Sequence, residues 1–219
     1  MMRPVITVVD YGRSNLLSVR RALEYCGADV GFAANPGDIQ RARALVLPGV
    51  GAFADGMAQL YRRGLVEPLL QKAGEGAPLL GICLGMQMLL DSSIEGGFHK
   101  GLGLVEGTVE LLPDKTTDGT ALKVPHIGWN AITLEPGAEQ GLFKNTQNGD
   151  EVYFVHSFQA LPRRSEDCAA TVEYGGYTIC AAVRRNNVAG LQFHPEKSGP
   201  AGLAILQAFV EELRNAGKG

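Results

Sequence analysis

Short apolar runs alternate with helix-like segments through the first hundred residues. The runs VITVVD, DVGFA, ALVLP and PLLGI read as buried strands. A first helix is predicted to end at Gly27, a second to begin at Asn35-Pro36, and a third to lie around residues 57–65. The apolar positions with helical spacing are Leu16, Val19 and Leu23 in the first helix and Met57, Leu60, Tyr61 and Leu65 in the third. Strands that alternate with helices favour a parallel sheet covered by helices on both faces.

The pattern changes from about residue 102. Runs rich in β-branched and aromatic residues, separated by Gly, Asn, Asp and Pro, predict hairpins. These runs are LGLVEGTVEL, NAITL, EVYFVHSF, ATVEY, YTICAAVRR and VAGLQF. After Ser198, apolar residues fall on one helical face, so the last predicted element is an amphipathic helix packed on the sheet. Its apolar positions are Leu203, Leu206, Val210 and Leu213.

These patterns together predict an α/β fold in a single domain over residues 1–219. The central sheet is expected to be mostly parallel and flanked by helices, with an added antiparallel portion. The chain has 219 residues, 45% of them hydrophobic and 20% charged, as in a globular protein with a sizeable core. The net charge of −3 and the absence of a basic block argue against nucleic acid as a partner. Asp10 interrupts the first apolar run and no run reaches a membrane span, so a cytoplasmic protein is expected.

The four cysteines do not suggest a disulfide framework or a zinc site. They are scattered and form no CxxC pair, so all are predicted to be free thiols, with no metal or cofactor. Only Cys83 has an unusual setting, within Gly81-Ile-Cys83-Leu-Gly85. This spacing matches a nucleophile elbow, where flanking glycines permit a sharp strand-to-helix turn. A thiol at a helix N-terminus is favoured as thiolate. The alternative is a small buried cysteine beside incidental glycines.

A histidine and a glutamate are predicted to complete the chemistry at Cys83. His194 ends an apolar run, and the following proline biases it toward extended backbone. Residues two apart in an extended chain share a face, so Glu196 would orient the His194 imidazole and stabilise its charged form. His99, His126 and His156 lack such a partner. Since the acid follows the histidine by two residues, the chain order disfavours an ordinary α/β-hydrolase.

A tetrahedral intermediate at Cys83 would need donors for its oxyanion. The backbone N–H of Leu84 is one, and the second is expected at Val50 or Gly51 in the segment PGVG, where glycines permit a peptide flip. Gly49-x-Gly51-x-x-Ala54 also fits a dinucleotide-binding fingerprint. That reading is weaker, because the segment follows the third strand and no acidic strand end stands about 20 residues later. A nicotinamide enzyme stays as the weaker alternative.

The motifs GICLGMQ and HPE resemble those of the class I glutamine amidotransferases, which hydrolyse glutamine through a glutamyl thioester. The chain more closely resembles the family of glutaminase subunits of imidazole glycerol phosphate synthases. DYGRSNL, LPGVGAF, KVPHIGWN, YFVHSF and HPEKS carry this resemblance from Asp10 to Ser198. One departure is Ser14, where the family usually has a second glycine.

The resemblance implies L-glutamine as substrate and a (β/α)8 cyclase as partner in a heterodimer. The cyclase would use the ammonia in histidine biosynthesis, and a sealed interface would keep that ammonia unprotonated. By analogy, the partner interface would contain Asn15, Trp129, Asn130, Tyr153 and Lys197. Trp129 is the only tryptophan and suits an interface anchor. For each residue taken alone, ordinary surface packing is the alternative.

Substrate binding is expected at Gln87, one helical turn beyond Cys83, unless that residue is simply solvated. The other candidates are Gly51, Glu95, Ser157 and Phe158. Besides the nicotinamide enzyme, three alternatives remain open: the glutaminase of another class I amidotransferase, a stand-alone cysteine hydrolase, and a noncatalytic binding module.

Overall fold

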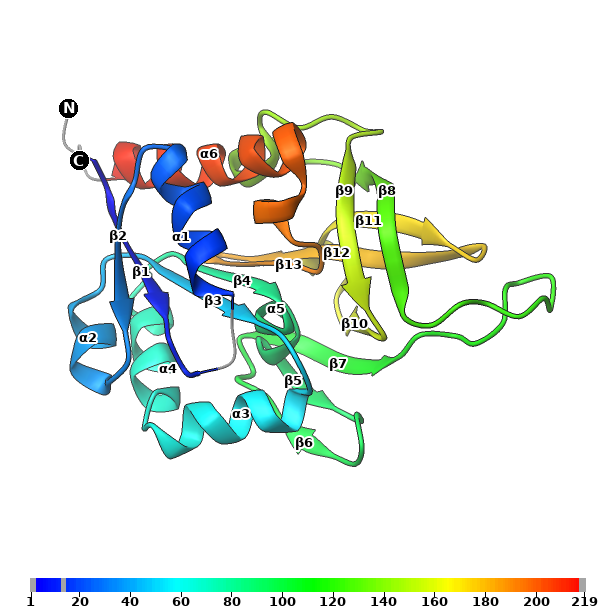
Figure 1. Ribbon diagram of the computed structural model, residues 1–219, viewed down its shortest axis with the longest axis horizontal. Helices are drawn as coiled ribbons and strands as arrows, with labels where there is room; N and C mark the ends of the chain where they lie inside the picture. The colour runs from blue at the N-terminus through cyan, green and yellow to red at the C-terminus, as the bar shows by residue number, and fades with distance from the viewer. Residues whose placement is uncertain (1–2, 13–14, 217–219) are drawn as a thin grey trace.

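A parallel sheet forms one half of the molecule, as seen in a computed structural model that describes residues 3–12 and 15–216 (Figure 1). Its strand order is β2-β1-β3-β4-β13, and each neighbouring pair is parallel. The strands are β1 (Val5–Val9), β2 (Asp29–Ala33), β3 (Leu45–Gly49), β4 (Leu79–Cys83) and β13 (Val188–Leu191). All four of the early apolar runs therefore form strands as predicted. Ser14 lies outside the described residues.

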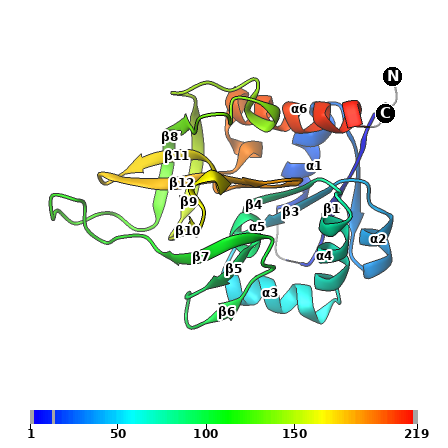
Figure 2. The ribbon, with the colours of Figure 1, turned by 180° about the vertical axis from the view of Figure 1, so that it is seen from behind.

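Helices cover both faces of this parallel half (Figures 1 and 2). The helices are α1 (Leu16–Tyr25), α2 (Pro36–Arg41), α3 (Phe53–Arg62), α4 (Val66–Gly74), α5 (Leu84–Met88) and α6 (Gly199–Ala216). α1 and α6 lie on one face, with α2, α3 and α4 on the other. The predicted start of α2 is confirmed, since the Asn35 side chain accepts a hydrogen bond from Asp38 N. No helix in the described ranges is both long enough and apolar enough to cross a membrane.

Alternate residues of the parallel strands feed two separate hydrophobic cores. In β3, Val46 packs into the core beneath α1 and α6, whereas Leu45 and Leu47 pack beneath α3 and α4. In β4, Leu80 and Ile82 enter the first core and Leu79 the second. This two-sided burial explains why β3 and β4 read as continuous apolar runs.

The antiparallel portion continues the same sheet beyond β13. The order runs β13-β12-β10-β7-β5-β6, with β11 joining β12 to the pair β8 and β9. Its strands are β5 (Leu90–Ser93), β6 (His99–Lys100), β7 (Val105–Leu111), β8 (His126–Leu134), β9 (Glu151–His156), β10 (Phe158–Pro162), β11 (Cys168–Tyr174) and β12 (Tyr177–Arg185), with short 3-10 turns η1 (Gly141–Phe143), η2 (Ser165–Asp167) and η3 (Pro195–Lys197). The predicted α/β domain with an added antiparallel portion is confirmed.

The helix predicted around Met57 and Leu65 is in fact two helices. α3 ends at Arg62, Gly64 adopts a φ of +67°, and Leu65 caps the start of α4. Leu65 still packs in the same core as Met57. The apolar spacing therefore identified core residues correctly but concealed the break, which the left-handed glycine produces.

Two strands after Cys83 were not foreseen. The helix that follows the cysteine has five residues, and the chain becomes extended again at Leu90 to form β5. β5 pairs in parallel with β7 and antiparallel with β6. A continuous apolar run does not distinguish a helix from a buried strand, which is why the sequence did not reveal this change.

Glycines let α5 lie directly against the sheet. A Cβ at Gly85 would lie 1.7 Å from the backbone oxygen of Leu47, and a Cβ at Gly81 would lie 2.7 Å from the backbone nitrogen of Met86. Both obstructing atoms belong to the backbone, so a side chain at either position would displace α5 from β3 or β4. The glycines of the GICLG motif are therefore required by packing.

We expect Gly85→Ala to lower the free energy of unfolding by roughly 3 kcal/mol, because the methyl group must push two backbone segments apart. Gly74→Ala is the matched control, since a Cβ there meets open space. That substitution in a helix should alter stability by less than about 1 kcal/mol, in the stabilising direction. Urea unfolding followed by circular dichroism measures both. Equal stability of the two variants would contradict the packing argument.

Candidate active site

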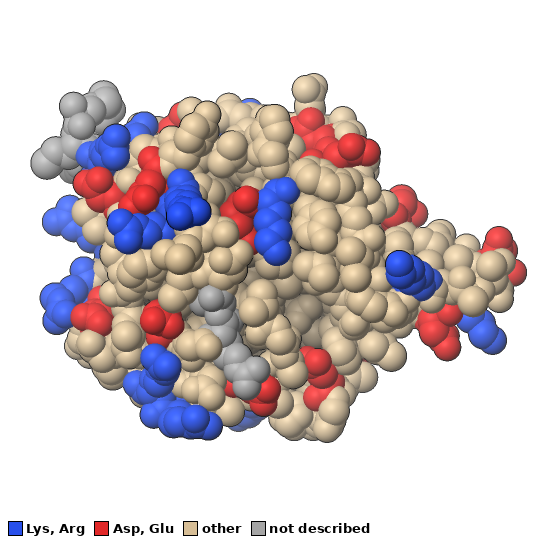
Figure 3. Space-filling model, viewed as in Figure 1, with Lys and Arg blue, Asp and Glu red and all other residues tan. Residues whose placement is uncertain are grey.

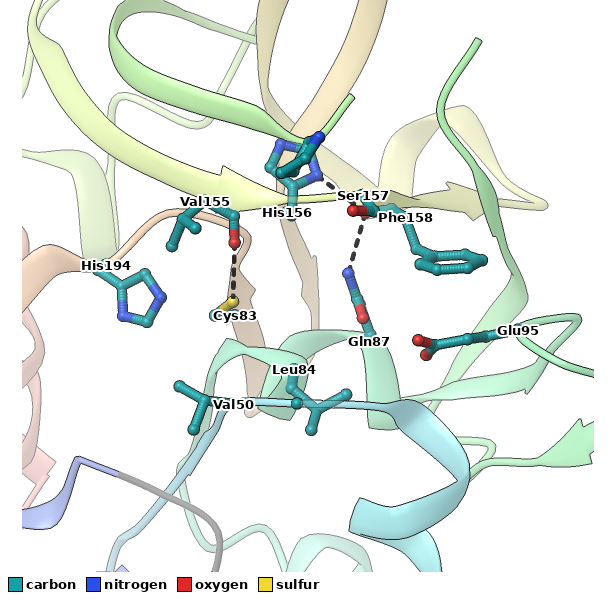
Figure 4. A pocket seen from close by; sticks show the side chains of 12 residues that line it. Val50, Cys83, Leu84, Gln87, Glu95, Val155, His156, Ser157, Phe158 and His194 are labelled. Carbon is teal, nitrogen blue, oxygen red and sulfur yellow. Dashed lines mark hydrogen bonds between the residues drawn. The ribbon is translucent and has the colours of Figure 1, made fainter. Parts of the chain in front are cut away.

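Cys83 occupies a strained turn between β4 and α5. Its φ and ψ are 54° and −112°, and it is the N-cap of α5. A non-glycine residue in such a conformation costs on the order of 1–3 kcal/mol, so the surrounding structure must enforce it. The thiol lies 3.9 Å from the carbonyl oxygen of Val155 and 3.9 Å from Nε2 of Gln192. This geometry has the features of the predicted elbow, with the sulfur at the edge of a cavity (Figure 4).

His194 and Glu196 form a buried pair next to the cysteine. Nδ1 of His194 lies 2.8 Å from Oε1 of Glu196, and the two side chains are 3% and 1% exposed. The predicted contact is present, but the reason given for it is wrong. His194 is extended, whereas Glu196 lies in the 3-10 turn η3, with Pro195 at its first position. The tight turn, and not a shared strand face, brings the carboxylate back to the ring.

Strand β9 fixes the position of this turn. The backbone N–H of His194 donates to Tyr153 O at 3.0 Å. Ser198 Oγ accepts from Tyr153 N at 3.0 Å and donates to His194 O at 2.6 Å. The residues on both sides of η3 are therefore tied to one residue of β9, which orients the imidazole toward Cys83 in Figure 4.

The surroundings of His194 favour its charged form. Burial by itself would lower the pKa, but the sulfur of Cys83 and the carboxylate of Glu196 outweigh it and raise the pKa of His194 to about 9. Nε2 of His194 is buried and has no hydrogen-bond partner within residues 3–12 and 15–216. A proton on this nitrogen is thus available to a molecule in the cavity.

A cavity of about 330 Å³ opens beside Cys83 and His194. This volume falls within the range of small-molecule sites. Every residue predicted to bind substrate or to supply an oxyanion donor lines it: Val50, Gly51, Leu84, Gln87, Glu95, Ser157 and Phe158. The structure thus gathers Cys83, His194 and the whole predicted binding set around one cavity.

The sheet register brings the PGVG segment to the cysteine. Gly49 pairs with Cys83 across β3 and β4, so the residues that follow each strand emerge side by side. Gly51 has a φ of +98°, a conformation that glycine adopts readily. A Cβ at Gly49 would meet the Tyr11 hydroxyl and Leu84. Packing against Leu84 accounts for the first glycine of the dinucleotide-like fingerprint.

Gln87 is buried and not solvated. Its Nε2 donates to Phe158 O and to Gln192 Oε1, both at 3.0 Å. Glu95 also has an internal partner, since its Oε2 accepts from Phe53 N at 2.7 Å. Both side chains therefore serve as fixed parts of the cavity wall.

Three wall residues were missed: Pro125, Val155 and His156. His156 stands in the YFVHSF motif, so the motif itself was the available signal. His156 has no acidic residue close by in sequence, unlike His194 with Glu196. One partner of His156 is the nearby Phe158 carbonyl, and the other is His126, which strand pairing brings close and sequence spacing does not reveal.

Three of the predicted interface residues lie together on the surface. Trp129 pairs with Tyr153 across β8 and β9, their rings meet edge to face at 5.9 Å, and Lys197 Nζ lies 6.0 Å from the Tyr153 ring. Trp129 is 51% exposed. Asn130 is half-buried and its Oδ1 contacts His126, whereas Asn15 is an exposed N-cap of α1.

Charges of both signs intermingle on the face shown in Figure 3.

The four cysteines are free, although the sulfurs of Cys168 and Cys180 lie 3.3 Å apart. Among the described residues, no group of three or more His, Cys, Asp and Glu side chains is arranged to hold a metal ion.

Comparison with known proteins shows the class of protein to which the chain belongs. Residues 7–213 match the family model described as glutamine amidotransferase class-I. The structure of PurLQS from Thermotoga maritima is similar in fold, with a TM-score of 0.75 and 21% identity over 97% of this chain and 100% of that one. A glutamine amidotransferase from the same organism has a TM-score of 0.62 and 15% identity over 99% and 86% of the two chains.

Curated relatives narrow the assignment. The chain is 46% identical to imidazole glycerol phosphate synthase subunit HisH of Moorella thermoacetica, over 99% of this chain and 98% of the relative. It is also 46% identical to HisH 1 of Legionella pneumophila (strain Lens), over 94% and 98%. The chain therefore belongs to the class I glutamine amidotransferases and, within them, to the family of HisH subunits of imidazole glycerol phosphate synthase.

We expect the His194 imidazole to stay protonated through neutral pH and to titrate near pH 9. Cys83→Ala should move this midpoint downward, because the contribution of the sulfur disappears while burial persists. Cys26→Ala removes a thiol far from the cavity and should leave the midpoint unchanged. Nuclear magnetic resonance of ¹⁵N-labelled histidine follows the titration. A wild-type midpoint at or below 6.5 would contradict the charge arrangement.

Proposed function

We propose that this chain is the glutaminase subunit of imidazole glycerol phosphate synthase. It hydrolyses L-glutamine to glutamate and ammonia and supplies the ammonia to a cyclase subunit for histidine biosynthesis. The observation that carries the mechanism is the buried His194–Glu196 pair, whose free imidazole nitrogen shares a cavity with the strained Cys83. The amidotransferase domain takes in residues 1–219, and the reaction uses no metal or cofactor.

In the first half-reaction, the Cys83 thiolate attacks the side-chain carboxamide carbon of glutamine. The resulting oxyanion accepts hydrogen bonds from the N–H of Leu84 and from a peptide N–H at Val50 or Gly51. The His194 imidazolium donates its Nε2 proton to the amide nitrogen. The carbon–nitrogen bond then breaks, leaving ammonia and a glutamyl thioester on Cys83.

The same histidine can act as a base in the second half-reaction. Once Cys83 is acylated, its sulfur carries no negative charge, so one of the causes that raise the pKa of His194 is lost. His194, now neutral, removes a proton from water as the water attacks the thioester. The carbon–sulfur bond then breaks, which releases the Cys83 thiolate and leaves His194 protonated as at the start. Glutamate leaves, and its carboxyl proton passes to solvent. Glu196 holds the ring in one orientation throughout both steps.

The partner is proposed to be a cyclase of (β/α)8 fold in a cytoplasmic heterodimer. The surface formed by Trp129, Tyr153 and Lys197 supports this, because Lys197 belongs to the same η3 turn as Glu196. A partner bound at this surface would therefore lie next to the site. Ammonia is mostly protonated in neutral water and then is no nucleophile. A partner docked at this surface, with Asn15 and Asn130 contributing, would shield the product until it reacts.

Three alternatives give different results in solution. A stand-alone cysteine hydrolase would act at full rate without a partner, and a noncatalytic module would not depend on Cys83. The glutaminase of another class I amidotransferase would respond to a different synthase subunit. A glutamine-analogue electrophile should label Cys83 selectively, which mass mapping of the modified peptide detects.

Glutamine turnover by the wild-type chain should be low alone and should rise when the cyclase and its ligand are added, because the partner sets the peptide at Val50 and Gly51. Cys83→Ala should abolish turnover in both conditions while retaining cyclase binding. Glutamate release and analytical ultracentrifugation measure these two properties. Cys180→Ala is the control thiol. Substantial turnover by Cys83→Ala would refute the nucleophile, and full activity of the wild-type chain alone would refute partner activation.

We expect Trp129→Ala to weaken cyclase binding at least about ten-fold, as is typical of a central aromatic anchor. Tyr25→Ala is the matched control, because Tyr25 is an 80% exposed aromatic residue at the far end of α1. Isothermal titration of each variant with the cyclase gives the dissociation constants. An unchanged constant for Trp129→Ala would place the interface elsewhere.

A further inference from the structure

A buried pair of histidines lies between the antiparallel strands and the cavity, outside the Cys83–His194–Glu196 set. Nδ1 of His126 lies 3.0 Å from Nε2 of His156, and these residues face each other in the register of β8 and β9. His156 lines the cavity, whereas His126 does not. His126 is fully buried, with its ring stacked between Phe154 and Tyr174. Nothing in the proposed reaction steps uses either ring.

The neighbouring acceptors determine where the protons on the two rings lie. Nδ1 of His156 is 2.8 Å from the carbonyl oxygen of Phe158, which can only accept, so this nitrogen carries the proton. Burial lowers the pKa of His126 and lowers that of His156 to about 4, so each neutral ring has a single N–H. Nε2 of His156 is therefore an acceptor, and the donor that reaches it is the Nδ1–H of His126.

This assignment fixes the next group as well. Nε2 of His126 is left without a proton, and it lies 2.9 Å from the side-chain amide oxygen of Asn130. An unprotonated Nε2 needs a donor, and the Asn130 amide supplies one when its oxygen and NH₂ group exchange places by a 180° rotation of the amide. All hydrogen bonds then run in one direction, from Asn130 through His126 and His156 to the Phe158 carbonyl.

The chain of hydrogen bonds continues to the nucleophile. Gln87 donates from Nε2 to the same Phe158 oxygen and to Oε1 of Gln192. The side-chain amide nitrogen of Gln192, Nε2, lies 3.9 Å from Cys83 Sγ. Gln192 has no exposed surface, and Gln87 is nearly as buried. Buried polar groups cannot replace a lost partner with water. A change in one hydrogen bond of this chain therefore changes which hydrogen bonds the neighbouring side chains can make.

We propose that His126 is a positioning residue for this site. Its Nδ1–H selects the tautomer of His156, and that tautomer holds the Phe158 carbonyl. The carbonyl in turn orients Gln87 and Gln192, which set the amide beside the Cys83 sulfur. The kinetic consequence rests on the proposed glutaminase activity, whereas the tautomer assignment does not.

The first test requires no substitution. Long-range ¹H–¹⁵N correlation spectra of the wild-type chain should show both His126 and His156 protonated at Nδ1 and not at Nε2. A His156 ring protonated at Nε2 would overturn the proposal directly. This measurement also separates the two hypotheses, because it stands whether or not glutamine is hydrolysed.

The second test compares His126→Phe with His126→Gln in the complex with the cyclase. His126→Phe keeps a ring between Phe154 and Tyr174 but removes the donor to His156. We expect kcat for glutamine to fall about ten-fold with a smaller change in KM, because the chain ends at the nucleophile. The His156 tautomer should become mixed. His126→Gln can donate an amide N–H to His156, so it should restore the Nδ1–H tautomer and bring kcat to within about three-fold of wild type.

Tyr174→Phe is the matched control, because it keeps the ring stacked on His126 and removes only a hydroxyl that donates to Lys123 O. It should leave kcat, KM and the tautomer unchanged. A folded His126→Phe variant with wild-type kcat and an unchanged tautomer would refute the proposal. Equal losses in folded His126→Phe and His126→Gln would also refute it and indicate a purely structural role. No turnover by the wild-type complex would refute the glutaminase function instead, with the tautomer result unaffected.

Discussion

The site depends on the close contact between α5 and the backbone of β3. Gly85 lies so near the Leu47 carbonyl that no side chain fits between them, and this contact holds the chain in a sharp turn at Cys83. The turn places Cys83 where one of the hydrophobic cores meets the wall of the cavity. The sheet register contributes as well, since pairing of Gly49 with Cys83 places the predicted oxyanion donors beside Cys83. Catalytic geometry thus follows from backbone packing more than from contacts between catalytic side chains.

Local sequence was sufficient where one short segment contained the whole physical cause. The GICLG spacing predicted the elbow because both glycines and the cysteine lie in one turn. The His194–Glu196 contact was also anticipated, although a 3-10 turn produces it. The alternation of strands and helices gave the fold class, because each unit buries its own apolar face.

What the sequence did not reveal was set by distant pairing. His126 and His156 lie on different strands, so their hydrogen bond depends on the register of β8 and β9. The internal partners of Gln87 come from residues far along the chain. The break at Gly64 and the short α5 were missed because apolar periodicity reports burial and not where an element ends. Family motifs contained His156 but did not indicate its neighbours.

The position of β13 in the sheet has a consequence for how the protein is made. β13 is formed from residues near the end of the chain, yet it pairs between β4 and β12, in the middle of the sheet. Until residues 188–191 emerge from the ribosome, β4 presents an unpaired apolar edge immediately before the cysteine. Nascent chains at that stage are open to association with one another, and the turn at Cys83 lacks one of its two flanking strands. The surroundings of Cys83 are therefore complete only after residues 188–196 have been synthesised.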